Sequence, residues 1–181
     1  MNPVLQAIAR AALDATGAEA SWVLGLIGDH LEAMGAAGPQ AGELLGVVVP
    51  VGAGTVGYVV SSGQPMAIAP RGADPRLSEG LGARLGRMPA SLLCVPCHHE
   101  DAIVGALELV DKAGGAPFSI DDVELVTLLG GIAGAALSLA GAEVPARPPA
   151  ELASELVELS SSDPAAYARL SVVLEALLAR G

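Results

Sequence analysis

Residues 91–137 read SLLCVPCHHEDAIVGALELVDKAGGAPFSIDDVELVTLLGGIAGAAL, and this stretch decides the fold. The runs at 90–97 and 102–112 are rich in Val, Ile and Leu, and each predicts a strand. The polar residues HHED at 98–101 predict a turn between them. Two strands joined by so short a turn form an antiparallel hairpin.

A long helix is predicted directly after this hairpin. It begins at Ser119 and continues to about Gly141. Asp122 stands three residues after Ser119, which resembles a capping box with Asp in place of Glu. The residues between the second strand and Ser119 are predicted to be a loop.

The residues before the hairpin predict more antiparallel structure. Asn2 and Pro3 are typical of a helix start, and Gly17 of a helix end. Further elements follow in order: strands at 20–29, 30–38 and 44–51, a helix at 55–63, a short strand at 64–70, and a loop with a helix at 71–88. Hairpins dominate this order, so we expect an α+β fold with an antiparallel sheet rather than repeated βαβ units.

The end of the chain differs in composition from the rest. Three prolines fall within 142–150, which predicts a linker. Two amphipathic helices are predicted within 151–181, the second beginning at Asp163. We therefore expect a domain at 1–141, the linker, and a helical appendage that docks a partner or covers a dimer.

The charge balance narrows the classes of partner. The formal net charge is −11, which argues against nucleic acid and against an anionic membrane surface. The longest uncharged run, 125–142, approaches the length of a membrane span, but Glu124 and Glu143 flank it and Gly and Ala dilute it. It predicts a buried or dimer-forming helix. No secretory signal is evident, and we expect a cytoplasmic, bacterial protein.

Three stretches together resemble the GAF sensor domain family over residues 4–140. They are VVPVGAGTVGYVVSSGQPMAI (48–68), ADPRLSEGLGARLG (73–86) and the stretch at 91–137. The resemblance implies a profilin-like sheet of about six antiparallel strands. Terminal helices would cover one face, and short helices and loops would form a ligand pocket on the other. Family members bind small molecules or partner proteins, often pair through terminal helices, and are usually not enzymes.

The two cysteines, Cys94 and Cys97, form a Cys-x-x-Cys motif followed by His98 and His99. Residues three apart on a strand point to opposite faces, so one metal ion cannot easily take both thiols. A redox motif of this kind would also need a helix N-terminus to lower a thiol pKa. We favour a structural strand end; a ligand-lining thiol at Cys94 and a metal or redox site remain alternatives. No metal or cofactor is expected. A bilin is disfavoured because aromatic residues are few, and haem because His30, His98 and His99 each fall in or beside a predicted turn.

A set of residues is predicted to line the ligand pocket. Arginines cluster around one aspartate in an otherwise acidic chain, and Arg recognises anions and carboxylates well. The set consists of Trp22, Tyr58, Arg71, Asp74, Arg76, Arg84 and Cys94. The alternatives are solvated helix charges for the arginines and core packing for the aromatic residues.

Lys112, Phe118 and Asp122 partly match a signature of cyclic-nucleotide-binding GAF domains. Asp111 stands where that signature has Asn, and Val123 where it has Glu. These departures, and the lack of aromatic surface for a purine, disfavour cyclic-nucleotide binding. A structural interpretation is an ion pair of Lys112 with Asp122 that ties the loop to the helix cap.

Small residues recur at four-residue spacing in both terminal helices, and small faces allow close helix packing. The residues that we assign to a homodimer interface are Ala7, Ala11, Gly130, Gly134 and Ser138.

The sequence predicts a non-catalytic signalling module that binds a small molecule or a protein partner. One alternative is a ligand-free dimerisation scaffold. Another is an enzyme that reduces methionine sulfoxide with its cysteines, because some GAF-fold proteins do so. No catalytic residue is assigned.

Overall fold

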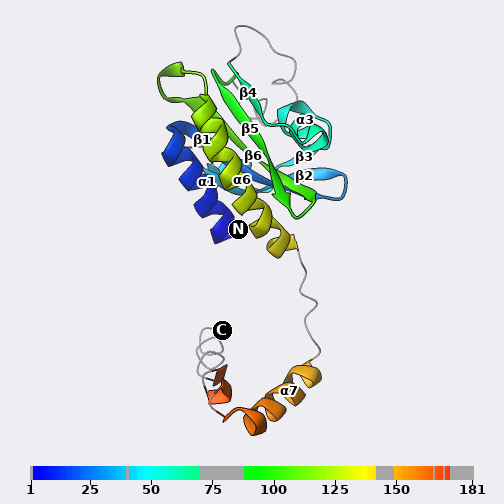
Figure 1. Cartoon of the computed structure of the whole chain (residues 1–181). Helices are drawn as coiled ribbons and strands as arrows, with labels where there is room; N and C mark the ends of the chain where they lie inside the picture. Colours follow the sequence, from blue (N-terminus) through cyan, green and yellow to red (C-terminus); the bar gives the residue numbers. More distant parts are fainter. Residues whose placement is uncertain are drawn as a thin grey trace. The chain divides into compact units, whose positions relative to one another are not determined.

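The computed structural model describes residues 2–39, 41–69, 88–141, 149–164, 166–168 and 170–171. The chain divides into two compact units, Met1–Gly141 and Ala142–Gly181. The first contains α1 (Pro3–Thr16), β1 (Ala18–Ile27), β2 (His30–Ala37), α2 (Ala41–Leu44), β3 (Val48–Pro50), α3 (Gly54–Ser62), β4 (Met66–Ile68), β5 (Leu92–His99), β6 (Ala102–Lys112), the 3₁₀ turn η1 (Ala113–Gly115) and α6 (Ile120–Gly141) (Figure 1).

The strands form one antiparallel sheet in the order β3-β2-β1-β6-β5-β4. β6 therefore lies inside the sheet, between β1 and β5. This arrangement confirms the predicted α+β class and the six antiparallel strands.

The turn of the β5–β6 hairpin is shorter than predicted. His98 and His99 belong to β5. The register shifts at a bulge between Cys97 and His98, and the two histidines then pair with Ile103 and Ala102 of β6. The chain reverses at Glu100 and Asp101, and Glu100 adopts a positive φ of 52°. The predicted turn over 98–101 is therefore twice as long as the observed one.

The third strand is also shorter than the predicted 44–51. Leu44 ends the short helix α2 and is buried, and Gly46 then takes a left-handed φ of 77°. Strand pairing starts only at Val48. Backbone geometry at Gly46 thus overrides the β propensity of the Leu and Val residues around it.

Different helices cover the two faces of the sheet (Figure 1). α1 and α6 lie side by side across one face and contact β1, β2, β5 and β6. The other face carries α2 and α3, with α3 over β5 and β6. Each face has its own aliphatic core, as the alternation of side chains along buried strands requires.

α6 is long and apolar enough to cross a membrane by length and composition. In this structure one side of α6 packs on β5 and β6 through Val126, Ala133 and Leu137, and 28% of its most apolar window is buried.

The small residues of α6 face the sheet of their own chain. A Cβ added at Gly130 would lie 3.0 Å from the Pro96 carbonyl oxygen, and one at Gly134 would overlap the His98 carbonyl group. The assignment of Gly130 and Gly134 to a dimer interface was therefore wrong, because the backbone of β5 already occupies their faces. Ser138 is half-buried.

In the second unit, α7 (Pro149–Ser162) begins within the stretch predicted as a linker. The Asp163 side chain then accepts a hydrogen bond from the backbone N–H of Ala166, as expected for the start of the second helix.

Gly134→Ala should lower the free energy of unfolding by about 3 kcal/mol, because α6 must move away from β5 to relieve the overlap. Gly131→Ala is the matched control: no atom lies within 4 Å of its added Cβ. We expect that variant to gain about 0.5–1 kcal/mol from helix propensity. Urea denaturation of both variants measures the difference, and equal stabilities would show that α6 does not approach β5 closely.

Candidate functional site

Three side chains with unusual chemistry form one row across the middle of the sheet. Trp22 of β1 is the direct neighbour of Glu108 of β6, and Glu108 is the direct neighbour of Cys94 of β5. All three are fully buried. The row lies on the face that α3 covers, where Thr55 contacts Glu108.

Glu108 is a carboxylic acid inside an aliphatic core. Its Oε2 accepts a hydrogen bond of 2.6 Å from the Thr55 hydroxyl, while its Oε1 is buried with no hydrogen-bond partner. Burial raises the pKa of Glu108 to about 7, although the hydrogen bond from Thr55 opposes this rise. The carboxyl is therefore partly protonated near neutral pH.

The sequence analysis missed Glu108. Its signal was present: it is the one charged residue in the run Ile103–Val110, where neighbouring positions on the same face, Ala106 and Val110, are apolar. A charge at an inward position of a strand with both faces buried calls for an explanation.

Trp22 carries a second unsatisfied group. Its indole Nε1 is buried and has no hydrogen-bond partner. The row thus holds a donor and an acceptor without partners, and each such group costs about 1–3 kcal/mol. A bound polar molecule would satisfy both.

The rest of this face is apolar. It is lined by Leu24, Leu31, Leu44, Val49, Val56, Val59, Val60, Leu92 and Val110. Apolar walls with a few convergent polar groups are typical of small-molecule sites.

The two cysteines point to opposite faces, as the strand geometry predicted. Cys94 belongs to the core under α3, and Cys97 to the core under α1 and α6. Burial, and then the Glu108 carboxylate, raise the pKa of the Cys94 thiol well above its ordinary value. Burial alone raises the pKa of Cys97 to about 12. Both cysteines are free, and neither is a thiolate at neutral pH.

The other predicted pocket residues are not in this row. Tyr58 lies on α3, but its side chain is 48% exposed. Arg71, Asp74, Arg76 and Arg84 lie outside the described residues. Within the described part of the chain, no group of three or more His, Cys, Asp or Glu side chains could hold a metal ion.

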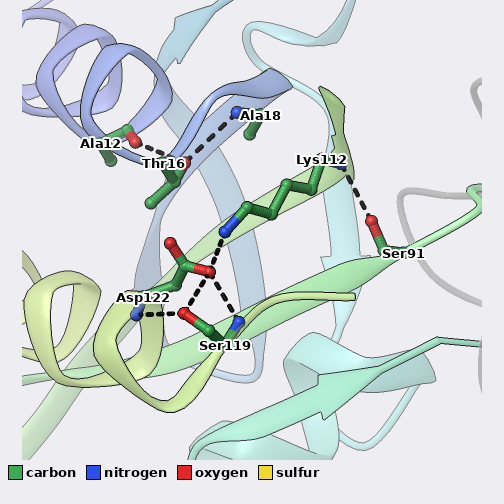
Figure 2. Close-up of polar contacts among 7 residues, drawn as sticks. All are labelled: Ala12, Thr16, Ala18, Ser91, Lys112, Ser119 and Asp122. Carbon is green, nitrogen blue, oxygen red and sulfur yellow. Dashed lines mark hydrogen bonds and ion pairs between the residues drawn. The ribbon is translucent and has the colours of Figure 1, made fainter. Parts of the chain in front are cut away.

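Lys112 and Asp122 form the predicted ion pair, and Figure 2 shows its surroundings. The Ser119 backbone N–H and hydroxyl donate to the Asp122 carboxylate at 2.6 and 2.8 Å, and the Asp122 N–H donates to Ser119 Oγ at 3.2 Å. This is the predicted capping box. Burial raises the pKa of Asp122, but the hydrogen bonds from Lys112 and Ser119 outweigh burial and hold that pKa below its usual range.

The ring of Phe118 also contacts this pair, since Lys112 Nζ lies 6.0 Å from its centroid. Lys112, Phe118 and Asp122 thus join the loop to the start of α6, which supports the structural interpretation of these residues.

The unfolding free energy should depend on pH through Glu108. Its folded pKa lies above the unfolded value, so the folded state binds more protons between pH 4.5 and 7 and stability falls as pH rises through that window. A rise to about 7 corresponds to about 3 kcal/mol. In Glu108→Gln this dependence should be absent, so the stability difference between the two proteins should change by about 3 kcal/mol from pH 4.5 to pH 8.

Urea denaturation at several pH values measures this difference. Asp122, whose pKa is lowered, changes its protonation at more acidic pH and so does not affect the pH dependence of stability between pH 4.5 and 7. Parallel pH profiles of the two proteins would show that Glu108 is solvated.

Comparisons with known proteins agree with this architecture. The family model "GAF domain" matches residues 1–137. The GAF-B domain of DevS from Mycobacterium smegmatis is 25% identical, with a TM-score of 0.60 over 76% of this chain and 92% of that chain. A free methionine-R-sulfoxide reductase from Neisseria meningitidis has the same fold at 19% identity, with a TM-score of 0.58 over 74% of this chain and 75% of that chain.

A curated relative is a dual 3′,5′-cyclic-AMP and -GMP phosphodiesterase 11A from Takifugu rubripes. It is 32% identical over 94 residues, which are 51% of this chain. The match spans only 10% of the length of that relative. The family match, in contrast, runs from the first residue through most of α6, and with the six-stranded sheet it establishes that this chain belongs to the GAF domain family.

Proposed function

We propose that this protein is a regulatory module that binds a small molecule on the face of the sheet under α3. GAF domains are regulatory domains of ligand binding and signalling. The observation that carries the proposal is the pair of buried, unpartnered polar atoms, Trp22 Nε1 and Glu108 Oε1, on neighbouring residues of that face.

A purely structural core offers no reason for this pair. Replacing Trp22 by an apolar residue of similar size would remove an unsatisfied donor, and replacing Glu108 together with Thr55 would remove an unsatisfied acceptor without leaving a hydroxyl unpaired. Strained or unsatisfied groups concentrate at functional sites. A ligand that enters this core would satisfy both atoms and offset their cost.

We further propose that the module is not an enzyme. Thiol chemistry requires an accessible thiolate, whereas Cys94 and Cys97 are buried, have raised pKa values and lie on opposite faces of the sheet. The likeness to sulfoxide reductases is below 25% identity and concerns the fold.

The proposal includes a homodimer, in which the outer faces of α1 and α6 meet those of a second copy. The exposed apolar residues of α6 recur at spacings of three and four, as in a coiled-coil seam. They are Leu125, Leu128, Ile132, Ala135 and Leu139, which we call the α6 stripe. Leu128, Ile132 and Leu139 are 71%, 56% and 77% exposed.

Ala7 and Ala11 keep their predicted role in this proposal. Both are exposed on α1, as is Val4, and α1 lies beside α6. A two-fold axis between the stripes would build a bundle of four helices, because the same surface can pair with itself. The helices of the second unit, where Val157 is exposed, would be free to dock a signalling protein.

The thiols should be inert in the folded protein. We expect both cysteines to react with an aromatic disulfide reagent at least a hundredfold more slowly in buffer than in urea, because burial disfavours the thiolate. No thioredoxin-coupled turnover of free methionine sulfoxide should occur. Turnover that is lost in Cys94→Ser but kept in Cys97→Ser would overturn the non-enzyme proposal.

Native mass spectrometry of the purified protein tests ligand binding and dimer formation together. We expect a dimer that carries a co-purified small molecule. Leu128→Lys with Ile132→Lys should give a monomer that keeps the adduct, because these residues lie on the opposite side of the sheet from Glu108. Trp22→Phe should give a dimer without the adduct.

An unliganded dimer whose melting temperature no compound of a metabolite library raises would favour a ligand-free scaffold. A monomeric wild-type protein would overturn the proposal of a homodimer.

A further inference from the structure

We propose that the ligand of the face under α3 is a small organic cation, an ammonium or amidinium compound with an apolar body, whose N–H donates to Oε1 of Glu108. This inference rests on the proposed function and adds the chemical class of the ligand.

The first argument is charge. Glu108 is fully buried, and of its two oxygens only Oε2 has a partner, the neutral Thr55 hydroxyl. Among the described residues, the Lys or His side chains in salt bridges are Lys112 and His30, which pair with Asp122 and Asp29 rather than with Glu108. A cationic N–H donor would supply both the missing hydrogen bond and the missing charge, and such bonds are about twice as strong as neutral ones. An anionic ligand would be repelled.

The second argument is the neighbouring indole. Trp22 stands directly beside Glu108 in the pairing of β1 with β6. Among aromatic side chains, tryptophan binds cations over its ring most strongly. Its unpartnered Nε1 would donate to an acceptor atom of the ligand or to a water molecule that enters with it. The carboxylate and the indole together select a cation over a neutral isostere.

The third argument is the remainder of the lining. Apart from Thr55, Glu108 and Cys94, the side chains of this core are aliphatic or aromatic. An inorganic cation would find a single carboxylate there, whereas Ca²⁺ and Mg²⁺ need six or more oxygen ligands. An organic cation with an aliphatic or aromatic body would instead replace its lost hydration with contacts to these apolar side chains.

Binding should depend on pH through Glu108, whose pKa is raised by burial to about 7. Among the described residues, burial and the hydrogen bond from Thr55 are the influences that shift the pKa of Glu108. From β5, Cys94 faces it as a neutral thiol; α3 has no charged residue; on β1, Glu19 is exposed. A cation that binds only the carboxylate should bind about tenfold more tightly at pH 8 than at pH 6.

The test uses the indole N–H signal of ¹⁵N-labelled full-length protein, because Trp22 is the only tryptophan in the chain. The probes are benzamidine and 3-methylbutylamine. Their uncharged isosteres, benzamide and 3-methylbutanol, are the controls. We expect both cations to shift the Trp22 signal saturably, the isosteres to shift it at least tenfold more weakly, and the cations to bind about tenfold less tightly at pH 6.

Glu108→Gln keeps the shape of the side chain and should abolish the preference for cations. Leu128→Lys, on the far side of the sheet, should retain it. Equal shifts from a cation and its isostere, or no pH dependence in the wild-type protein, would overturn the inference. So would a Trp22 signal that neither cation moves.

Failure of the inference differs from failure of the proposed function. If neutral or anionic metabolites move the Trp22 signal while cations do not, the module binds a ligand of another class. If no compound moves it and no adduct co-purifies, both are wrong.

Discussion

The position of β6 inside the sheet is the constraint on which the rest of the structure depends. β6 pairs with β1 on one side and β5 on the other, so both of its faces are covered. Its side chains alternate: Leu107 and Leu109 enter the core under α1 and α6, while Glu108 enters the core under α3. A shift of one residue would reverse this order and place the carboxylate against the long helices. The register of β6 therefore decides which face of the sheet holds the buried carboxyl group.

The two faces accordingly have different kinds of packing. Under α6 the contact is close, because glycines at 130 and 134 let the helix approach the backbone of β5. This leaves the outward side of α6 to larger apolar residues, which form the α6 stripe. Under α3 the core instead contains a row of polar groups, only one of which is satisfied by the hydroxyl of Thr55. Close packing therefore fixes α6 on one face of the sheet, whereas the other face holds buried polar atoms without hydrogen-bond partners.

Much of the fold could be predicted from local patterns. The strands and the capped helix follow from alternation and from Ser119 with Asp122, and the opposed cysteines follow from the period of a strand. The failures have specific causes. β5 continues past a bulge after Cys97, and no residue type announces a bulge of this kind. The spacing of Gly130 and Gly134 correctly indicates close packing, but spacing alone does not say whether the neighbour is another helix or a strand.

The site was only partly predictable for a similar reason. The sequence predicted that Trp22 and Cys94 line the pocket, but Glu108 joins them only once the register of β6 against β1 and β5 is known. The importance of Glu108 depends on which residues of the neighbouring strands lie beside it, and only the structure shows these. Its charge within an apolar strand was visible in the sequence.

The titration of Glu108 itself tests the central claim most directly. In protein labelled with ¹³C at the side-chain carboxyl of glutamate, the Glu108 signal can be assigned by its absence in Glu108→Gln and followed from pH 3 to pH 9. A midpoint near 7, well apart from the other glutamates, is the predicted result. A midpoint near 4.5 in protein refolded free of any co-purified ligand would contradict the account, since it would mean that water already reaches the carboxylate.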